Sequence, residues 1–141
     1  MSLQDLLSAN PVVPVVVDSA QEGVGVGRAL VAGVISLPAC TDGSWIMAAL
    51  ALGLDTVKFF PAEASGRIAT IKALSAAFPG LRFMPTGGVS AANLADYLCV
   101  PVVAACGGSW MVKKDLVKAG AWEEITRLSA EAVAIAKECG R

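Results

Sequence analysis

The sequence predicts an α/β fold in which helices cover a parallel sheet. Apolar runs of strand length recur along the chain, and segments rich in alanine and leucine with helical spacing lie between them. Continuously apolar strands joined by helices indicate a parallel sheet with both faces covered, which is either a doubly wound sheet or a (β/α) barrel. About five βα units are too few for a complete barrel of eight. No linker or block of charge divides the sequence, so we expect a single domain over residues 1–141.

The expected elements follow in chain order. Strands are expected at 12–17, 34–37, 56–60, 81–85 and 101–106, each a short apolar run. Helices are expected at 22–33, 44–53, 68–78, 90–98 and 122–139. Asp42 or Ser44 can cap the second of these helices, and Ser90 can cap the fourth. The last helix is amphipathic, so we expect it to pack one face on the domain.

Composition narrows the classes of partner. Eleven basic and twelve acidic residues give a net charge of −1, and no basic cluster is larger than Lys113-Lys114, which argues against nucleic acid or an anionic membrane. We expect a small, weakly charged ligand instead. Because 55% of the residues are apolar and only 16% are charged, we also expect a homo-oligomer that hides apolar surface. The pattern of a signal peptide and any apolar run of spanning length are missing, so a cytoplasmic protein is expected.

Residues that commonly carry metal and hydrolase chemistry are missing or scattered. The sequence contains no histidine, which removes the commonest metal ligand and general base, so zinc sites and Ser-His-Asp triads are poor interpretations. The four cysteines are Cys40, Cys99, Cys106 and Cys139, and they form no CxxC pair. We interpret them as small buried apolar side chains in a reducing compartment.

Glycine patterns indicate where a phosphate could bind. Gly23, Gly25 and Gly27 are spaced GxGxG rather than the GxGxxG of a dinucleotide site, so they favour a glycine-weakened helix. The segments Thr86-Gly87-Gly88 and Gly107-Gly108-Ser109 each follow an expected strand. In α/β barrels, bare backbone N–H groups after the last two strands hold phosphate, and the threonine and serine could add hydroxyl donors. The alternative is that these glycines only form tight turns.

A lysine interrupts the apolar run TVKFF, where a buried strand is expected to have no charge. Because side chains alternate along a strand, Lys58 shares a face with Thr56 and Phe60 and would point into a barrel. A desolvated lysine loses its proton more readily and can add to a ketone, forming a Schiff base that serves the cleavage or formation of an adjacent C–C bond. The alternative is a lysine that reaches water or pairs with Asp55 or Glu63. The glycine loops on the two following strands favour the chemical role, since all three would open on one face.

Several segments resemble one enzyme family. "GLDTVKFFPAEASG", "RFMPTGGVSAANLADYL" and "GGSWMV" resemble the 2-keto-3-deoxy-6-phosphogluconate (KDPG) and 4-hydroxy-2-oxoglutarate (KHG) aldolases, and "NPVVPVVV" with "GRALVAG" is similar to the first βα unit of that family. The resemblance implies a barrel enzyme of class I that needs no metal or organic cofactor, takes a small phosphorylated keto acid and usually forms homotrimers. It implies that Lys58 is the Schiff-base lysine and that Phe60 lies beside it. The phosphate end by this resemblance is formed by Thr86, Gly87, Gly88, Gly107, Gly108 and Ser109.

The chain departs from the family pattern after its first unit. There the family continues with a strand that carries a proton-transferring glutamate and a carboxylate-binding arginine, whereas this chain passes directly to "VISLPACTDGSWIMAALALG", which resembles the fifth unit. We therefore expect a partial TIM barrel of about five βα units with two unpaired strand edges. Asp18 and Glu63 are candidates to replace the glutamate, although we expect Glu63 to lie in solvent and Asp18 to cap the next helix.

Two functions follow as alternatives. The first is class I aldol cleavage of KDPG to pyruvate and glyceraldehyde 3-phosphate through a Schiff base on Lys58. The second is a catalytically impaired partial barrel that binds phosphorylated ligands or needs assembly between chains. Trp45 and Trp110 could line the pocket, although packing against helices is the commoner role of such side chains.

Overall fold

The computed structural model describes residues 12–14 and 37–141, and within them strands alternate with helices. The strands are β1 (Val12–Pro14), β2 (Thr56–Phe59), β3 (Arg82–Pro85) and β4 (Cys106–Gly108). The helices are α3 (Gly43–Ala51), α4 (Arg67–Ala77), α5 (Leu94–Leu98), the 3-10 helix η1 (Trp110–Val112), α6 (Lys114–Lys118) and α7 (Trp122–Glu138). The helix expected at 22–33 and residues 34–36 of the second expected strand lie outside the described residues.

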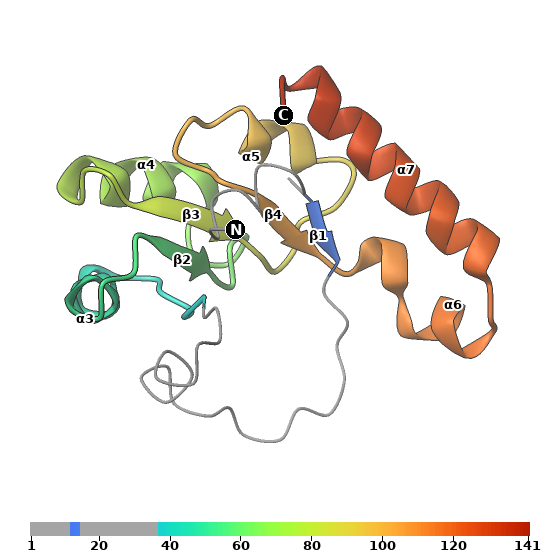
Figure 1. Cartoon of the computed structure of the whole chain (residues 1–141), viewed down its shortest axis with the longest axis horizontal. Coiled ribbons are helices and arrows are strands. Elements are labelled where there is room, and N and C mark those ends of the chain that lie inside the picture. Colours follow the sequence, from blue (N-terminus) through green and yellow to red (C-terminus); the bar gives the residue numbers. More distant parts are fainter. Residues whose placement is uncertain (1–11, 15–36) are drawn as a thin grey trace.

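The strand contacts are parallel and give the order of an opened barrel. β1 pairs with β4, and β2 pairs with β3. Isolated bridges join Ala39 to Lys58, Phe83 to Val103 and Thr86 to Gly107. The order is therefore segment 38–40, β2, β3, β4, β1, as Figure 1 shows for the labelled strands. A doubly wound sheet has its first strand inside the order, whereas here β1 joins the last strand, which is how a (β/α) barrel closes.

The two faces of the strands are covered by different sets of side chains. Val57, Phe59 and Phe83 are fully buried in the main core, and the rings of Phe59 and Phe83 meet edge to face with their centroids 6.4 Å apart. Burial of such a side chain contributes about 1.5–3 kcal/mol. The helices contribute to this core with Ile46, Ile71, Leu94, Tyr97, Leu98, Ala132 and Ala136. Met84 belongs to a second, smaller cluster with Ala104 and Ala105. The alternation predicted for the strands thus separates a large helix-covered face from a smaller one.

The strand expected at 101–106 is wrong in its placement. Residues near Pro101 form a turn in which the Val103 N–H donates to the Val100 carbonyl, at 2.9 Å. Residues 102–104 still pair with β3, since the Phe83 N–H donates to the Val102 carbonyl and the Ala104 N–H donates to the Phe83 carbonyl, each at 2.9 Å. The regular strand β4 starts only at Cys106 and takes in Gly107 and Gly108. The second glycine pair therefore forms the end of a strand rather than the loop that follows one.

The N-terminus of α3 is capped as the sequence predicts. The Asp42 carboxylate accepts hydrogen bonds from the backbone N–H groups of Ser44, at 2.9 Å, and Trp45, at 3.1 Å. Ser44 is inside the helix. The fourth expected helix is shorter than predicted, because Ser90 does not cap it and α5 begins only after Asn93. The helix expected at 122–139 is confirmed as α7, which packs against α5, α6, η1 and β1.

No helix in the described part of the chain combines the length and the apolar character needed to cross a bilayer.

Figure 1 shows α4, α5 and α7 on one side of the strands, and α3 beside β2. In (β/α) barrels the active site forms at the C-terminal ends of the strands, so a site is expected among the loops that follow β2, β3 and β4.

Candidate active site

Lys58 lies in β2 at a half-buried position. Its backbone bonds to segment 38–40 on one side of the strand, with the N–H donating to the Pro38 carbonyl at 2.9 Å and its carbonyl accepting from the Cys40 N–H at 2.8 Å. In register it is opposite Met84, so the lysine shares a face with the smaller apolar cluster rather than with the main core. Its ammonium nitrogen lies 4.9 Å from the centroid of the Phe60 ring, a distance at which a cation is attracted to an aromatic face.

Phe60 joins the lysine to the first glycine loop. A side chain at Gly87 would place its Cβ 2.9 Å from the Phe60 ring and 3.1 Å from the Cα of Pro61. The φ angle of Gly87 is 92°, in the left-handed region that other residues avoid. Gly88 has a φ of 82°, and a Cβ there would collide with the Glu63 side chain. Glycine is therefore required at both positions for the turn after β2 to lie this close to the loop after β3.

Backbone hydrogen bonds continue the pairing of β2 and β3 into these two turns. The Thr86 N–H donates to the Phe59 carbonyl at 2.9 Å, and the Thr86 carbonyl accepts from the Ala62 N–H at 2.8 Å. The Glu63 N–H donates to the Gly87 carbonyl at 3.1 Å. The Thr86 side chain is buried, with its hydroxyl 3.4 Å from the Met84 carbonyl. The loop after β3 is thus held firmly against the loop that follows the lysine strand.

The second glycine pair lies next to the first. A parallel bridge joins Thr86 to Gly107, so the ends of β3 and β4 are neighbours. Gly107 and Gly108 are buried, and Ser109 is exposed. A Cβ at Gly108 would collide with the ring of Trp110, so packing by itself explains that glycine. Lys58, the Thr86-Gly87-Gly88 segment and the Gly107-Gly108-Ser109 segment therefore occupy neighbouring strands at the same end of the sheet.

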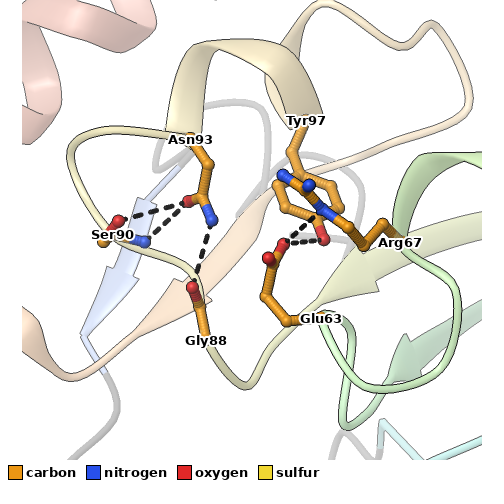
Figure 2. A network of polar contacts seen from close by, with 6 residues as sticks. All are labelled: Glu63, Arg67, Gly88, Ser90, Asn93 and Tyr97. Carbon is orange, nitrogen blue, oxygen red and sulfur yellow. Dashed lines mark hydrogen bonds and ion pairs between the residues drawn. The ribbon is translucent and has the colours of Figure 1, made fainter.

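Glu63 belongs to a network that the sequence did not predict. Its Oε1 accepts a hydrogen bond from the Tyr97 hydroxyl at 2.6 Å and pairs with the Arg67 Nε at 3.1 Å (Figure 2). The expectation that Glu63 lies in solvent is therefore only partly correct: a third of its side chain is exposed, but the phenol of the chain's one tyrosine reaches its carboxylate from α5. The Glu63–Arg67 pair has the i,i+4 spacing that could have indicated it. Tyr97 comes from a distant segment and gave no such signal.

The network gives Tyr97 an unusual titration. Burial, followed by the hydrogen bond to Glu63, raises the pKa of Tyr97 to about 12. The phenol donates to a carboxylate only while it is protonated, so the contact between α5 and the turn after β2 is sensitive to strong alkali. Glu63 uses its carboxylate in this structural contact.

Asn93 holds the other end of the first glycine loop. Its side-chain amide donates to the Gly88 carbonyl at 3.1 Å, and its Oδ1 accepts from the Ser90 N–H at 2.8 Å (Figure 2). Ser90 is thus a donor to Asn93, whereas the sequence predicted it to be the cap of the helix. The amide fixes the path of the chain from Gly88 to α5.

Other candidates from the sequence fall outside this cluster. Asp18 lies outside the described residues. Trp45 is 63% exposed and lines an apolar cavity of about 330 Å³ between α3 and residues 38–40. The described residues contain no group of three His, Cys, Asp or Glu side chains that could hold a metal ion.

Comparison with known proteins identifies the class. The family model "KDPG and KHG aldolase" matches residues 26–128. The 2-dehydro-3-deoxy-phosphogluconate aldolase of Pseudomonas aeruginosa is 52% identical over 97 residues, which cover 69% of this chain and 44% of the relative. The chain thus spans less than half the length of this curated relative.

Two solved structures agree with this similarity. The KDPG aldolase of Legionella pneumophila, with pyruvate captured as a covalent carbinolamine intermediate, has a TM-score of 0.66 at 42% identity and covers 68% of this chain and 47% of its own. The aldolase of Zymomonas mobilis with 3-phosphoglycerate has a TM-score of 0.69 at 35% identity, covering 77% of this chain and 51% of its own. The described strands have the parallel (β/α) architecture of a barrel. The chain belongs to the KDPG and KHG aldolase family.

Replacing Gly87 by alanine tests the packing of the first glycine loop. Gly80 is the matched control, since its φ of 87° is equally left-handed but a Cβ there meets nothing within 4 Å. Gly80→Ala is expected to cost about 1–2 kcal/mol from backbone strain. Gly87→Ala should cost at least about 1 kcal/mol more, because the Phe60 ring must also move. Urea unfolding of both variants measures the difference, and equal losses would contradict the contact.

Replacing Tyr97 by phenylalanine tests the network. We expect Tyr97→Phe to lower the free energy of unfolding by about 1–2 kcal/mol, because a hydrogen bond to a carboxylate is lost. Arg67→Ala is the control and should change stability much less, since an exposed ion pair contributes little.

The pH dependence of the same variant gives a second measurement. The folded pKa of Tyr97 is raised from 10.0 to about 12, so its stabilising contribution is complete below pH 10 and lost as pH rises through 12. Wild-type protein should therefore lose more stability between these pH values than Tyr97→Phe does. Parallel pH profiles would contradict the assignment.

Proposed function

We propose that this chain carries the class I aldolase chemistry of its family, with Lys58 as the nucleophile that cleaves KDPG to pyruvate and glyceraldehyde 3-phosphate. The observation that carries the proposal is the position of Lys58 within β2, half-buried on the Met84 face, one strand away from the first glycine loop. The carbinolamine captured with pyruvate in the Legionella relative supports the same type of intermediate here.

The reaction requires one amine and a way to move protons. The neutral amine of Lys58 adds to the keto carbon, giving a carbinolamine that loses water to form an imine, which is protonated. A base then takes the proton of the C4 hydroxyl, the C3–C4 bond breaks with its electron pair passing to the protonated imine to give an enamine, and C4 leaves as the aldehyde carbon of glyceraldehyde 3-phosphate. The remaining enamine takes up a proton, and water hydrolyses the resulting imine to pyruvate and free lysine. The Phe60 ring lies beside the amine and forms one apolar wall next to it.

The phosphate of the substrate would lie at the ends of β3 and β4. The proposed donors are the backbone N–H groups of Gly87, Gly88, Gly107 and Gly108 and the hydroxyls of Ser109 and Thr86. The Thr86 hydroxyl would have to turn away from the Met84 carbonyl to serve in this way. The exposed position of Ser109 and the bridge between Thr86 and Gly107 support this assignment. The Zymomonas relative was solved with 3-phosphoglycerate, a ligand that also carries a phosphate.

Proton transfer is the step of the proposed mechanism for which the described residues are least suited. Glu63 already accepts hydrogen bonds from Tyr97 and Arg67, so it is a poor substitute for a mobile acid or base. A positioned general base typically contributes about 10²–10⁴ in rate, so we expect cleavage to be slower than in a complete family member by this factor. Formation of the imine should also be slower, because loss of water from the carbinolamine needs a proton donor, but water can supply this proton and the reduced adduct accumulates with time.

A second candidate function is a partial barrel that acts only after assembly. In the described residues, segment 38–40 and β1 are the two ends of the strand order. Beside the first of these ends, α3 and the turn after it expose Trp45, Met47, Leu50 and Leu52. An apolar surface of this kind favours contact with another chain. We therefore propose a homo-oligomer, with the trimer suggested by the family as its expected form, in the cytoplasm.

Trapping with borohydride tests the first function. Wild-type protein incubated with pyruvate and then reduced should gain the mass of one reduced pyruvate on the peptide that contains Lys58. Lys58→Ala should gain none. Lys72→Ala, which removes an exposed lysine of α4, should react as wild type does. Cleavage of KDPG is measured in parallel by the release of pyruvate.

The result separates the two candidates. An adduct on Lys58 without measurable cleavage supports an intact nucleophile with defective proton transfer. If wild-type protein gains no adduct, or if Lys58→Ala gains as much, the aldolase proposal is wrong and the assembly-dependent partial barrel is favoured.

A further inference from the structure

Two cysteines from distant parts of the sequence meet at the ends of two helices. Cys99 is the C-cap of α5 and Cys139 is the C-cap of α7, and their sulfur atoms are 3.3 Å apart. Cys99 is exposed and Cys139 is half-buried. Their interpretation as buried apolar side chains is therefore wrong for this pair. An oxidant can reach one sulfur, and a second sulfur is already beside it.

The surrounding contacts hold this pair together. α5 packs directly against α7. The Arg141 guanidinium, two residues after Cys139, donates hydrogen bonds to the carbonyls of Leu98 at 3.2 Å and Val103 at 3.0 Å. These bonds fasten the end of α7 to the chain on both sides of Cys99. The sulfur contact is therefore maintained by structure that does not depend on the thiols.

The other two cysteines, Cys40 and Cys106, are internal controls for the reactivity of this pair. Cys40 is 1% exposed and Cys106 is fully buried, so an oxidant in solution reaches neither directly. Burial raises the pKa of the Cys106 thiol to about 12, which keeps it protonated and unreactive. The pKa of Cys40 is also raised, chiefly by burial. Burial also raises the pKa of Cys139, so accessibility rather than pKa distinguishes the pair, and reaction is expected first at the exposed Cys99.

We propose that Cys99 and Cys139 form a reversible disulfide within one chain when the protein meets a peroxide. Attack of the Cys99 thiolate on hydrogen peroxide forms the S–O bond of a sulfenic acid, breaks the O–O bond and, after protonation, releases water. The Cys139 sulfur then attacks the sulfenic sulfur, forms the S–S bond and releases a second water. Overall, two thiols are oxidised and one peroxide is reduced to two waters.

The geometry favours formation of the disulfide over further oxidation of the sulfenic acid. A disulfide has sulfurs about 2.05 Å apart, so small rotations of both side chains close the remaining gap. The resolving sulfur is in contact before the oxidant arrives, so the sulfenic acid is consumed before it can progress to irreversible forms. The cross-link closes a loop that contains β4, η1, α6 and the whole of α7. It should stabilise the folded chain by restricting the unfolded one.

Mild oxidation of the full chain tests this inference independently of any aldolase activity. Protein is treated with a slight excess of hydrogen peroxide, its remaining thiols are alkylated with N-ethylmaleimide after denaturation, and the products are mapped by mass spectrometry. Two of the four thiols should become unavailable, and the cross-linked peptide should join Cys99 to Cys139. The melting temperature of the oxidised chain should rise by about 5–15 °C and return to its original value after reduction with dithiothreitol.

Two variants control the experiment. Cys99→Ser and Cys139→Ser should each lose both the cross-link and the rise in melting temperature. A cross-link that involves Cys40 or Cys106, one that forms between chains and increases with protein concentration, or a sulfinic acid on Cys99 with Cys139 still free would each overturn the proposal. So would a cross-link within one chain that leaves the melting temperature unchanged.

Discussion

The contact between the turn after β2 and the glycine pair after β3 is the constraint on which the rest of the described site depends. Three backbone hydrogen bonds extend the pairing of the two strands into this contact. It requires Gly87 and Gly88, because both have positive φ angles and a Cβ at either would meet Phe60 or Glu63. The strand that carries Lys58 is therefore held in a fixed register beside the loop proposed to bind phosphate. A nucleophile and a distant phosphate subsite need such a fixed relation to act on one substrate.

Contacts continue from this turn to the outer helices. Glu63 connects the turn to Tyr97 in α5, and Asn93 connects the first glycine loop to the start of the same helix. At its other end α5 meets α7 through Cys99 and Cys139. The helical layer is thus attached at several points by polar or sulfur contacts, two of which, Glu63–Tyr97 and Cys99–Cys139, join segments distant in sequence. Apolar packing does not depend on the orientation of the groups that meet, whereas a hydrogen bond does, so these contacts help to fix how the helices are oriented on the core.

The sequence was most informative where a side chain acts locally. Asp42 was predicted as a cap because its carboxylate satisfies backbone groups two and three residues later, which local spacing determines. The same type of reasoning was only partly correct for Glu63. Its charge indicated solvent, but the structure supplies a phenol from α5 as a partner. Cys99 was misassigned for a related reason, because composition describes how often cysteine is buried and says nothing about one particular helix end.

The alternation of strands and helices, the positions of β2 and β3 and the residues proposed for the chemistry can all be predicted from the sequence. This is possible because apolar periodicity and the φ preferences of glycine and proline act over a few residues. Three features become visible only in the folded chain: β1 joins β4, β4 begins as late as Cys106, and Tyr97 and Cys139 have partners in distant segments. These features depend on which segments meet in space, and their energy is gained only after the chain has closed the long loops between them.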